Sequence, residues 1–175
     1  YQVQDKAHDS ILKKIDVDPE WFLDLLENTK EYLSKEAYDK YGLYPVFIPM
    51  KHPTDVKISN ELCEAVGMGY VIDRQYGVED MVSFISSCRV VLGMRLHTLI
   101  FSVGNGVPCI GISYDPKIDG FMEYVGQKKF LSATDFDSEK ATEYIKEIME
   151  NYEAECDYLC EKSKEMKELA FKNAK

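Results

Sequence analysis

The chain has 175 residues, of which 45% are hydrophobic, and a formal net charge of −10. This length is enough for one ordinary domain with a hydrophobic core of its own. The negative charge argues against nucleic acid or an anionic membrane surface as the main partner. A transmembrane segment is not predicted either, because no apolar run reaches about 20 residues. Basic side chains that gather at one place are therefore informative, since they act against the overall field of the protein.

The cysteine spacing indicates free thiols. No two cysteines form a Cys-x-x-Cys pair, and no Cys/His set has the spacing of a zinc site. Most lie in apolar surroundings, where a reduced thiol packs like a small hydrophobic side chain. We therefore expect a cytoplasmic protein that holds no metal. The cysteines are Cys63, Cys88, Cys109, Cys156 and Cys160.

The predicted elements begin with Tyr1–Gln4, which has the pattern of the end of a strand. We expect its beginning to be truncated and the chain to be a piece of a longer one. A helix is predicted from Asp18-Pro19, a capping acid followed by proline, to Tyr41-Gly42. Further helices are predicted near 58–66, 78–85, 95–103 and 121–125. One long last helix is predicted from Asp135 or Asp137 to about 169. Strands are predicted at 44–50, 69–72, 89–92 and 107–113.

The alternation of strands and helices predicts the fold class. The strands are continuously apolar, which is typical of a parallel sheet covered by helices on both faces. We therefore predict a Rossmann-like, doubly wound α/β domain. Residues 1–130 are expected to form this ligand-binding domain, and residues 131–175 a long helical segment packed on it.

In such folds ligands bind at the C-terminal ends of the parallel strands. Gly93 and Arg95 lie at a predicted strand-to-helix turn, where the helix N-terminus favours an anion. Gly93 allows close approach of the backbone to a ligand, and Arg95 offers a guanidinium fork for a carboxylate or phosphate. Lys117 adds a second positive charge from the next strand end. Three polar loops are expected at this edge: residues 51–55, 93–97 and 113–117.

His97 lies two residues after Arg95. Histidine can donate or accept a proton near neutral pH, which makes His97 a candidate general acid. A single hydrogen bond from His97 to the ligand is the competing interpretation, and the sequence leaves both open.

Four residues are weaker candidates. Tyr114 and Asp115 are expected to shape the ligand loop. His52 with Asp55 is a candidate second group, although a surface loop with a proline explains this pair without a function. Walker, Gly-x-Gly-x-x-Gly, His-Glu-x-x-His and Gly-x-Ser-x-Gly motifs are all absent. Their absence argues against nucleotide hydrolysis, a dinucleotide cofactor, a zinc protease and a serine hydrolase.

At these residues the sequence resembles the polysaccharide pyruvyl transferase family. The resemblance extends from about residue 44 to 126 and is closest to the branch that modifies the cell-wall polysaccharide anchoring S-layer proteins. The residues that carry it are 93–97, 106–108, 111–117, and 46–50 with the downstream Asp55.

The resemblance implies a glycosyltransferase-B-like fold of two domains, of which this chain is the C-terminal half. The implied reaction transfers pyruvate from phosphoenolpyruvate to two sugar hydroxyls as a cyclic ketal and releases phosphate. Arg95 and the Leu96 backbone would hold phosphoenolpyruvate, His97 would be the general acid, and Lys117 would support the anionic donor. The family draws another donor-binding arginine from the N-terminal domain, so we expect the isolated chain to be inactive.

The implied partners are phosphoenolpyruvate as co-substrate, a sugar or lipid-linked saccharide acceptor and the N-terminal domain, with no separate cofactor. A lipid-linked acceptor would place the enzyme at the inner face of the membrane in cell-wall or exopolysaccharide biosynthesis. Two alternatives stay open. One is the C-terminal domain of a nucleotide-sugar glycosyltransferase, with Arg95 and Lys117 on the diphosphate. The other is a non-catalytic module that binds an anion or a sugar.

Overall fold

The computed structural model describes residues 37–173. The predicted strand end at 1–4 and most of the helix predicted from residue 18 lie outside this range. In chain order the described elements are α3 (Ala37–Tyr41), β1 (Val46–Phe47), α4 (Thr54–Val66), β2 (Tyr70–Val71), α5 (Val78–Ser86), β3 (Val91–Gly93), α6 (Leu96–Gly104), β4 (Cys109–Ser113), α7 (Pro116–Tyr124), β5 (Phe130–Ser132), α8 (Ser138–Glu150) and α9 (Tyr152–Asn173).

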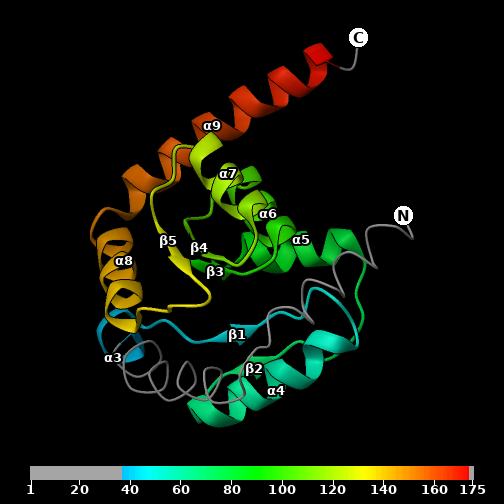
Figure 1. The fold of residues 1–175 in the computed structure, drawn as a ribbon, viewed down its shortest axis with the longest axis vertical. Helices are drawn as coiled ribbons and strands as arrows, with labels where there is room; N and C mark the ends of the chain where they lie inside the picture. The colour runs from blue at the N-terminus through cyan, green and yellow to red at the C-terminus, as the bar shows by residue number, and fades with distance from the viewer. Residues whose placement is uncertain (1–36, 174–175) are drawn as a thin grey trace.

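The strands form two parallel sheets. β1 pairs with β2, and β3, β4 and β5 pair in that order (Figure 1). The predicted α/β alternation with parallel strands is therefore confirmed for the described residues. The single continuous sheet is not observed, because no backbone ladder joins β1 and β2 to the other three strands.

The strands are shorter than predicted, and proline explains part of the difference. β1 is limited to Val46–Phe47 within the predicted range 44–50. Pro45 and Pro49 flank it, and proline has no N–H group to donate to a neighbouring strand. Pro45 still accepts a hydrogen bond through its carbonyl, from the Tyr70 N–H at 3.1 Å.

The three-stranded sheet is covered on both faces, as predicted. Successive residues of β4 point to opposite faces, so Cys109 joins one core cluster and Ile110 the other. The first cluster contains side chains of α5, α6, α7 and α9, and the second contains side chains of α8. Burial on both faces explains why β3 and β4 are apolar without interruption.

Two expectations for the C-terminal third were wrong. The strand β5 was not predicted, yet it pairs with β4 in the register Gly111↔Phe130. The long last helix is two helices, because Asn151 leaves the helical conformation with φ −120° and ψ 28°. The predicted start is confirmed at Asp137, whose carboxylate accepts a hydrogen bond from the Lys140 N–H at 2.9 Å.

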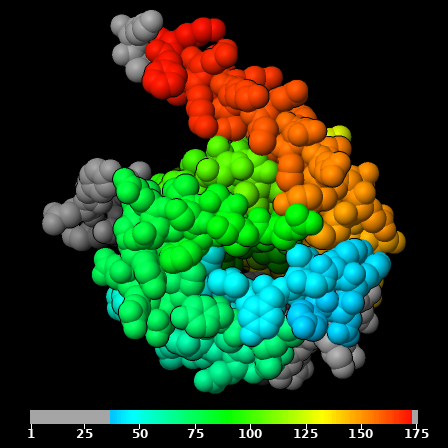
Figure 2. All heavy atoms as spheres, turned by 180° about the vertical axis from the view of Figure 1, so that it is seen from behind, coloured from blue at the N-terminus to red at the C-terminus, as the bar shows by residue number. Residues whose placement is uncertain are grey.

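The last helix extends beyond the rest of the molecule. α9 packs against α6 through its middle, where Ser163 contacts Gly104, and then continues outward to its C-terminal end (Figure 1). The reverse face shows α9 leaving the body in orange and red, and a hollow between the cyan and the green atoms (Figure 2). Among the described helices, none combines the length and the apolar composition that crossing a membrane requires.

Candidate active site

The turn between β3 and α6 carries the main predicted residues. Gly93 ends β3, and Arg95 precedes α6 with an extended backbone (φ −100°, ψ 131°). Its carbonyl begins the helix by accepting a hydrogen bond from the Thr98 N–H at 3.0 Å. A Cβ atom on Gly93 would lie 2.7 Å from Leu99 Cδ2, so glycine lets this turn fold tightly over α6. The predicted approach of Gly93 to a ligand stays a prediction.

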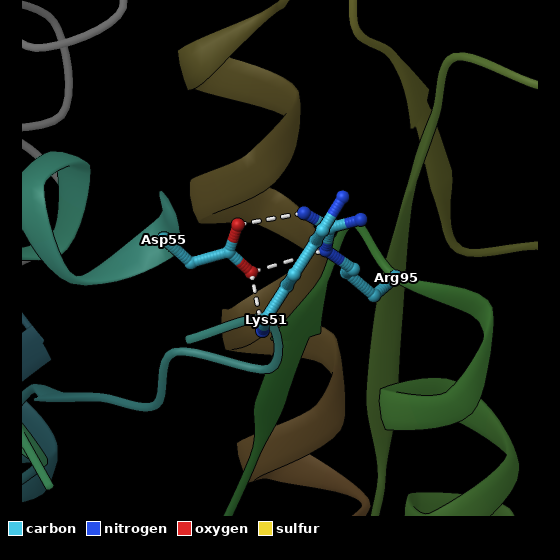
Figure 3. Close-up of polar contacts among 3 residues, drawn as sticks. All are labelled: Lys51, Asp55 and Arg95. Carbon is cyan, nitrogen blue, oxygen red and sulfur yellow. Dashed lines mark hydrogen bonds and ion pairs between the residues drawn. The ribbon is translucent and has the colours of Figure 1, made fainter. Parts of the chain in front are cut away.

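Arg95 forms a bidentate ion pair with Asp55 (Figure 3). Arg95 Nη2 lies 2.6 Å from Asp55 Oδ1, and Arg95 Nε lies 3.1 Å from Asp55 Oδ2. Asp55 was expected in a loop but lies in the first turn of α4, which begins at Thr54. The backbone N–H of Lys51 also donates to Asp55 Oδ2 at 2.9 Å. The loop after β1 is thereby joined to the turn after β3.

The turn between β4 and α7 lies at the same edge, because β3 and β4 are parallel neighbours. Asp115 caps α7 by accepting a hydrogen bond from the Lys117 N–H at 2.9 Å. The Lys117 ammonium is 3.7 Å from Asp115 Oδ2, and the lysine side chain is 67% exposed. Lys117 therefore extends largely into solvent, whereas the Arg95 side chain is 27% exposed and is held by Asp55.

Tyr114 lies between these groups. Burial raises the pKa of its hydroxyl; the positive charge of Arg95 opposes this effect, and the negative charges of Asp115 and Asp55 add to it. These electrostatic interactions show that Tyr114 lies near both members of the Arg95–Asp55 pair, and Asp115 is its neighbour in the chain. The structure thus brings together four of the predicted site residues from three elements of the chain.

His97 is exposed on the first turn of α6. Its ring centroid lies 6.3 Å from that of Phe101, with the ring planes tilted by 50°. Within residues 37–173 the imidazole makes no hydrogen bond. An exposed imidazole is accessible to a ligand, and this position suits a general acid and a hydrogen-bond donor equally.

His52 and Asp55, which the sequence grouped as a candidate, have different hydrogen-bond partners. The His52 Nε2 atom lies 3.0 Å from the Asp73 carbonyl oxygen, whereas Asp55 binds Arg95. Whether His52 and Asp55 act as a second site group stays a prediction, and the explanation by a surface loop stays open. The sequence identified Asp55 as a candidate but gave no sign of its partner, because the two residues are 40 positions apart.

No cluster of three His, Cys, Asp or Glu side chains that could hold a metal ion occurs in the described part of the chain. The groups that the site offers are the Arg95 guanidinium, the N-terminus of α6, the exposed His97 and the exposed Lys117. A helix N-terminus leaves its first N–H groups without partners inside the helix, and these groups favour anions. The arrangement suits an anion with a proton donor beside it.

Comparison with known families decides the assignment. A model of the polysaccharide pyruvyl transferase family matches residues 1–116, which is more than half of the chain. The chain belongs to the polysaccharide pyruvyl transferase family. No curated protein and no solved structure matches the chain.

The pyruvyl transferase match covers Asp55, Arg95, His97 and Asp115 and ends one residue before Lys117. The family consists of transferases that act on a saccharide acceptor, so the predicted family and enzyme class are confirmed. The roles of individual residues stay predictions.

Proposed function

We propose that this pyruvyl transferase moves pyruvate from phosphoenolpyruvate to two hydroxyls of a sugar, as a cyclic ketal, and releases phosphate. The observation that carries the proposal is the placement of Arg95 at the N-terminus of α6, two residues before the exposed His97. This turn provides a cation and a proton donor within the region that matches the family.

The donor and the site have complementary charge. Phosphoenolpyruvate carries a phosphate and a carboxylate. The Arg95 guanidinium and the N–H groups of Leu96 and the first turn of α6 suit one of these anionic groups. Lys117, long and largely exposed, suits the other.

The proposed chemistry needs one acid. His97 donates a proton to the methylene carbon C3 of phosphoenolpyruvate, and positive charge develops at C2. One acceptor hydroxyl attacks C2 and loses its proton. The bond from C2 to the phosphate oxygen then breaks, phosphate leaves with the electron pair, and the second hydroxyl closes the ketal. One hydroxyl proton restores His97 and the other leaves with phosphate or solvent, so atoms and charge balance.

The finer parts of the proposal concern the whole enzyme. We propose that the chain is the donor-binding half of a glycosyltransferase-B-like protein and that the acceptor approaches from the other domain. The product would belong to a cell-wall or exopolysaccharide saccharide, made in the cytoplasm on a lipid-linked acceptor. The family match supports the saccharide acceptor at the general level.

The decisive experiment uses the full-length protein. Thermal unfolding is measured with phosphoenolpyruvate and with UDP- and GDP-sugars, and phosphate release is measured with lipid-linked aminosugar acceptors. We expect stabilisation by phosphoenolpyruvate alone, together with acceptor-dependent phosphate release. Stabilisation by a nucleotide sugar would favour a glycosyltransferase instead. Binding of phosphoenolpyruvate without phosphate release across the acceptors tested would favour a non-catalytic module.

A further inference from the structure

We propose that Asp55 is a positioning residue that fixes the Arg95 guanidinium in the orientation that receives the anionic donor. This inference rests on the proposed function, because it concerns the same donor site. Asp55 acts through Arg95, and its predicted role in the sequence was only that of a candidate near the ligand.

The contact fixes the guanidinium plane. Asp55 accepts from Nε and from Nη2 of Arg95, at 3.1 and 2.6 Å (Figure 3). Two parallel N–H···O bonds define both the plane and the direction of the guanidinium fork, which a single contact would leave free to rotate. Without this two-bond contact, the long arginine side chain would populate more rotamers, and binding an anion would then cost more entropy of ordering it.

Asp55 is itself rigidly held. Its backbone N–H donates to the Lys51 carbonyl at 2.9 Å, and its Oδ2 accepts from the Lys51 N–H at 2.9 Å. The carboxylate lies on the first turn of the 13-residue helix α4, and its side chain is only 19% exposed. Arg95 is therefore anchored to a helix and a closed loop rather than to a flexible surface side chain.

Whether donor binding weakens or strengthens when the Asp55 charge is removed distinguishes a positioning role from a purely electrostatic one. Asp55 carries a negative charge next to the cation that would bind the anionic donor. If only charge mattered, removal of this negative charge would strengthen donor binding. Positioning predicts the opposite, because an asparagine amide offers one acceptor oxygen in place of two, so the guanidinium loses the two-bond contact that aligns it. Asp55→Asn keeps the size of the side chain and removes its charge, so this one variant distinguishes the two effects.

The matched control lies on the same helix. Glu61 forms an exposed ion pair with Lys57 at 3.7 Å, so Glu61→Gln removes the same charge from α4 without touching Arg95. In the full-length protein we expect Asp55→Asn to weaken phosphoenolpyruvate binding by about 10- to 100-fold in calorimetry and to raise KM more than it lowers kcat. Glu61→Gln should leave binding within about twofold of the wild type, as expected for an exposed pair. Unchanged or tighter binding in Asp55→Asn would overturn the proposal.

A second readout needs no ligand. An Arg95 Nε–H group that is held by a carboxylate gives a resolved, slowly exchanging signal in ¹H–¹⁵N NMR spectra, and we expect Asp55→Asn to shift it and accelerate its exchange. An unaltered signal would overturn the positioning role whatever phosphoenolpyruvate does. If the signal depends on Asp55 but wild-type protein does not bind phosphoenolpyruvate, then Asp55 does orient Arg95 and the proposed donor is wrong.

A double-variant cycle tests whether Asp55 acts through Arg95. Arg95→Lys retains the positive charge and loses the fork that Asp55 holds. We expect Arg95→Lys to weaken phosphoenolpyruvate binding to a similar degree, and the double variant with Asp55→Asn to bind no more weakly than Arg95→Lys alone. Additive losses would mean that Asp55 acts independently of Arg95 and would overturn the proposal.

Discussion

At the scale of single residues, position 97 combines a titratable ring with access to a ligand. His97 projects from the first turn of α6, and its nearest ring neighbour is Phe101, with ring centroids 6.3 Å apart. It makes no hydrogen bond to the described part of the chain, and its side chain is exposed. Its replacement should therefore affect chemistry more than folding.

We predict that His97→Ala in the full-length enzyme lowers kcat by about 10²- to 10⁴-fold, the range for loss of a general acid. Phosphoenolpyruvate binding should stay within about threefold of the wild type, because Arg95 and the α6 N-terminus remain. Acceptor-dependent phosphate release and calorimetry measure the two effects separately. Unchanged turnover would reduce His97 to a hydrogen-bond donor or to a residue without a role.

Cys109 shows what complete burial does to a titratable residue. The side chain is 1% exposed in the core of the three-stranded sheet. Burial, assisted by the negative charge of Glu155, raises the pKa of the thiol from 9.0 to about 12. The folded protein therefore holds this proton at pH values where the unfolded chain has released it.

Between pH 9 and 12 the unfolded chain binds fewer protons at Cys109 than the folded chain. We predict that this difference lowers the free energy of unfolding by up to about 1.4 kcal/mol per pH unit, while below pH 9 the stabilisation is fully present. Chemical denaturation of wild type and Cys109→Ala at pH 8, 9 and 10 isolates the contribution. The wild type should lose more stability than the variant as the pH rises; parallel losses would contradict the prediction.

At the scale of elements, side chains of α9 form hydrogen bonds with the C-terminal ends of α6 and α7. Ser163 donates a hydrogen bond to the Gly104 carbonyl at 2.9 Å, and the Tyr158 hydroxyl donates to the Val125 carbonyl at 3.0 Å. Gly106 follows α6 with φ +70°, and a Cβ atom there would collide with the Cys160 sulfur. The close approach of α9 therefore requires glycine at position 106.

We predict that Gly106→Ala lowers the free energy of unfolding by about 1 to 2 kcal/mol, because a Cβ atom strains a left-handed backbone. Gly104→Ala is the matched control: a Cβ atom there meets nothing within 4 Å, and the residue lies at the end of α6. It should leave stability unchanged or raise it by up to about 1 kcal/mol. Denaturant unfolding measures both variants, and equal effects would contradict the role given to α9.

At the scale of the whole molecule, the two sheets differ in burial. In β4, Cys109 and Ile110 are at most 1% exposed and lie between helices on both faces. In the smaller sheet Val46 is 45% exposed and its register partner Tyr70 is 62% exposed. The pairing between β1 and β2 involves only two residues of each strand.

We predict that backbone amides of β1 and β2 exchange with solvent faster than those of β3 and β4 in hydrogen-exchange mass spectrometry. The cause is the smaller buried apolar area that opening of β1 and β2 exposes. Peptides from α5 and α6 serve as internal references for slow exchange, since Ile85 and Leu99 are fully buried. Equal protection of both sheets would mean that they open as one unit.

Much of the fold followed from local patterns. Helix spacing identified α4, α5 and α6, and the carboxylate at Asp137 identified the start of α8. β5 was missed because a run of three residues, of which only Phe130 and Leu131 are apolar, does not differ from a loop until a neighbouring strand pairs with it. The break at Asn151 was missed because the apolar spacing continues across it.

By itself the sequence determined the parallel α/β pattern, the family and the position of Arg95 and His97 at a strand-to-helix turn. The pattern and the turn follow from residues close together in the chain, where periodicity and capping act, whereas the family follows from the resemblance of its motifs. Only the tertiary structure decided that the strands divide into two sheets and that Asp55 forms an ion pair with Arg95. The physical reason is that such contacts join residues 40 positions apart, and their geometry depends on how the packed helices and strands bring the two loops together.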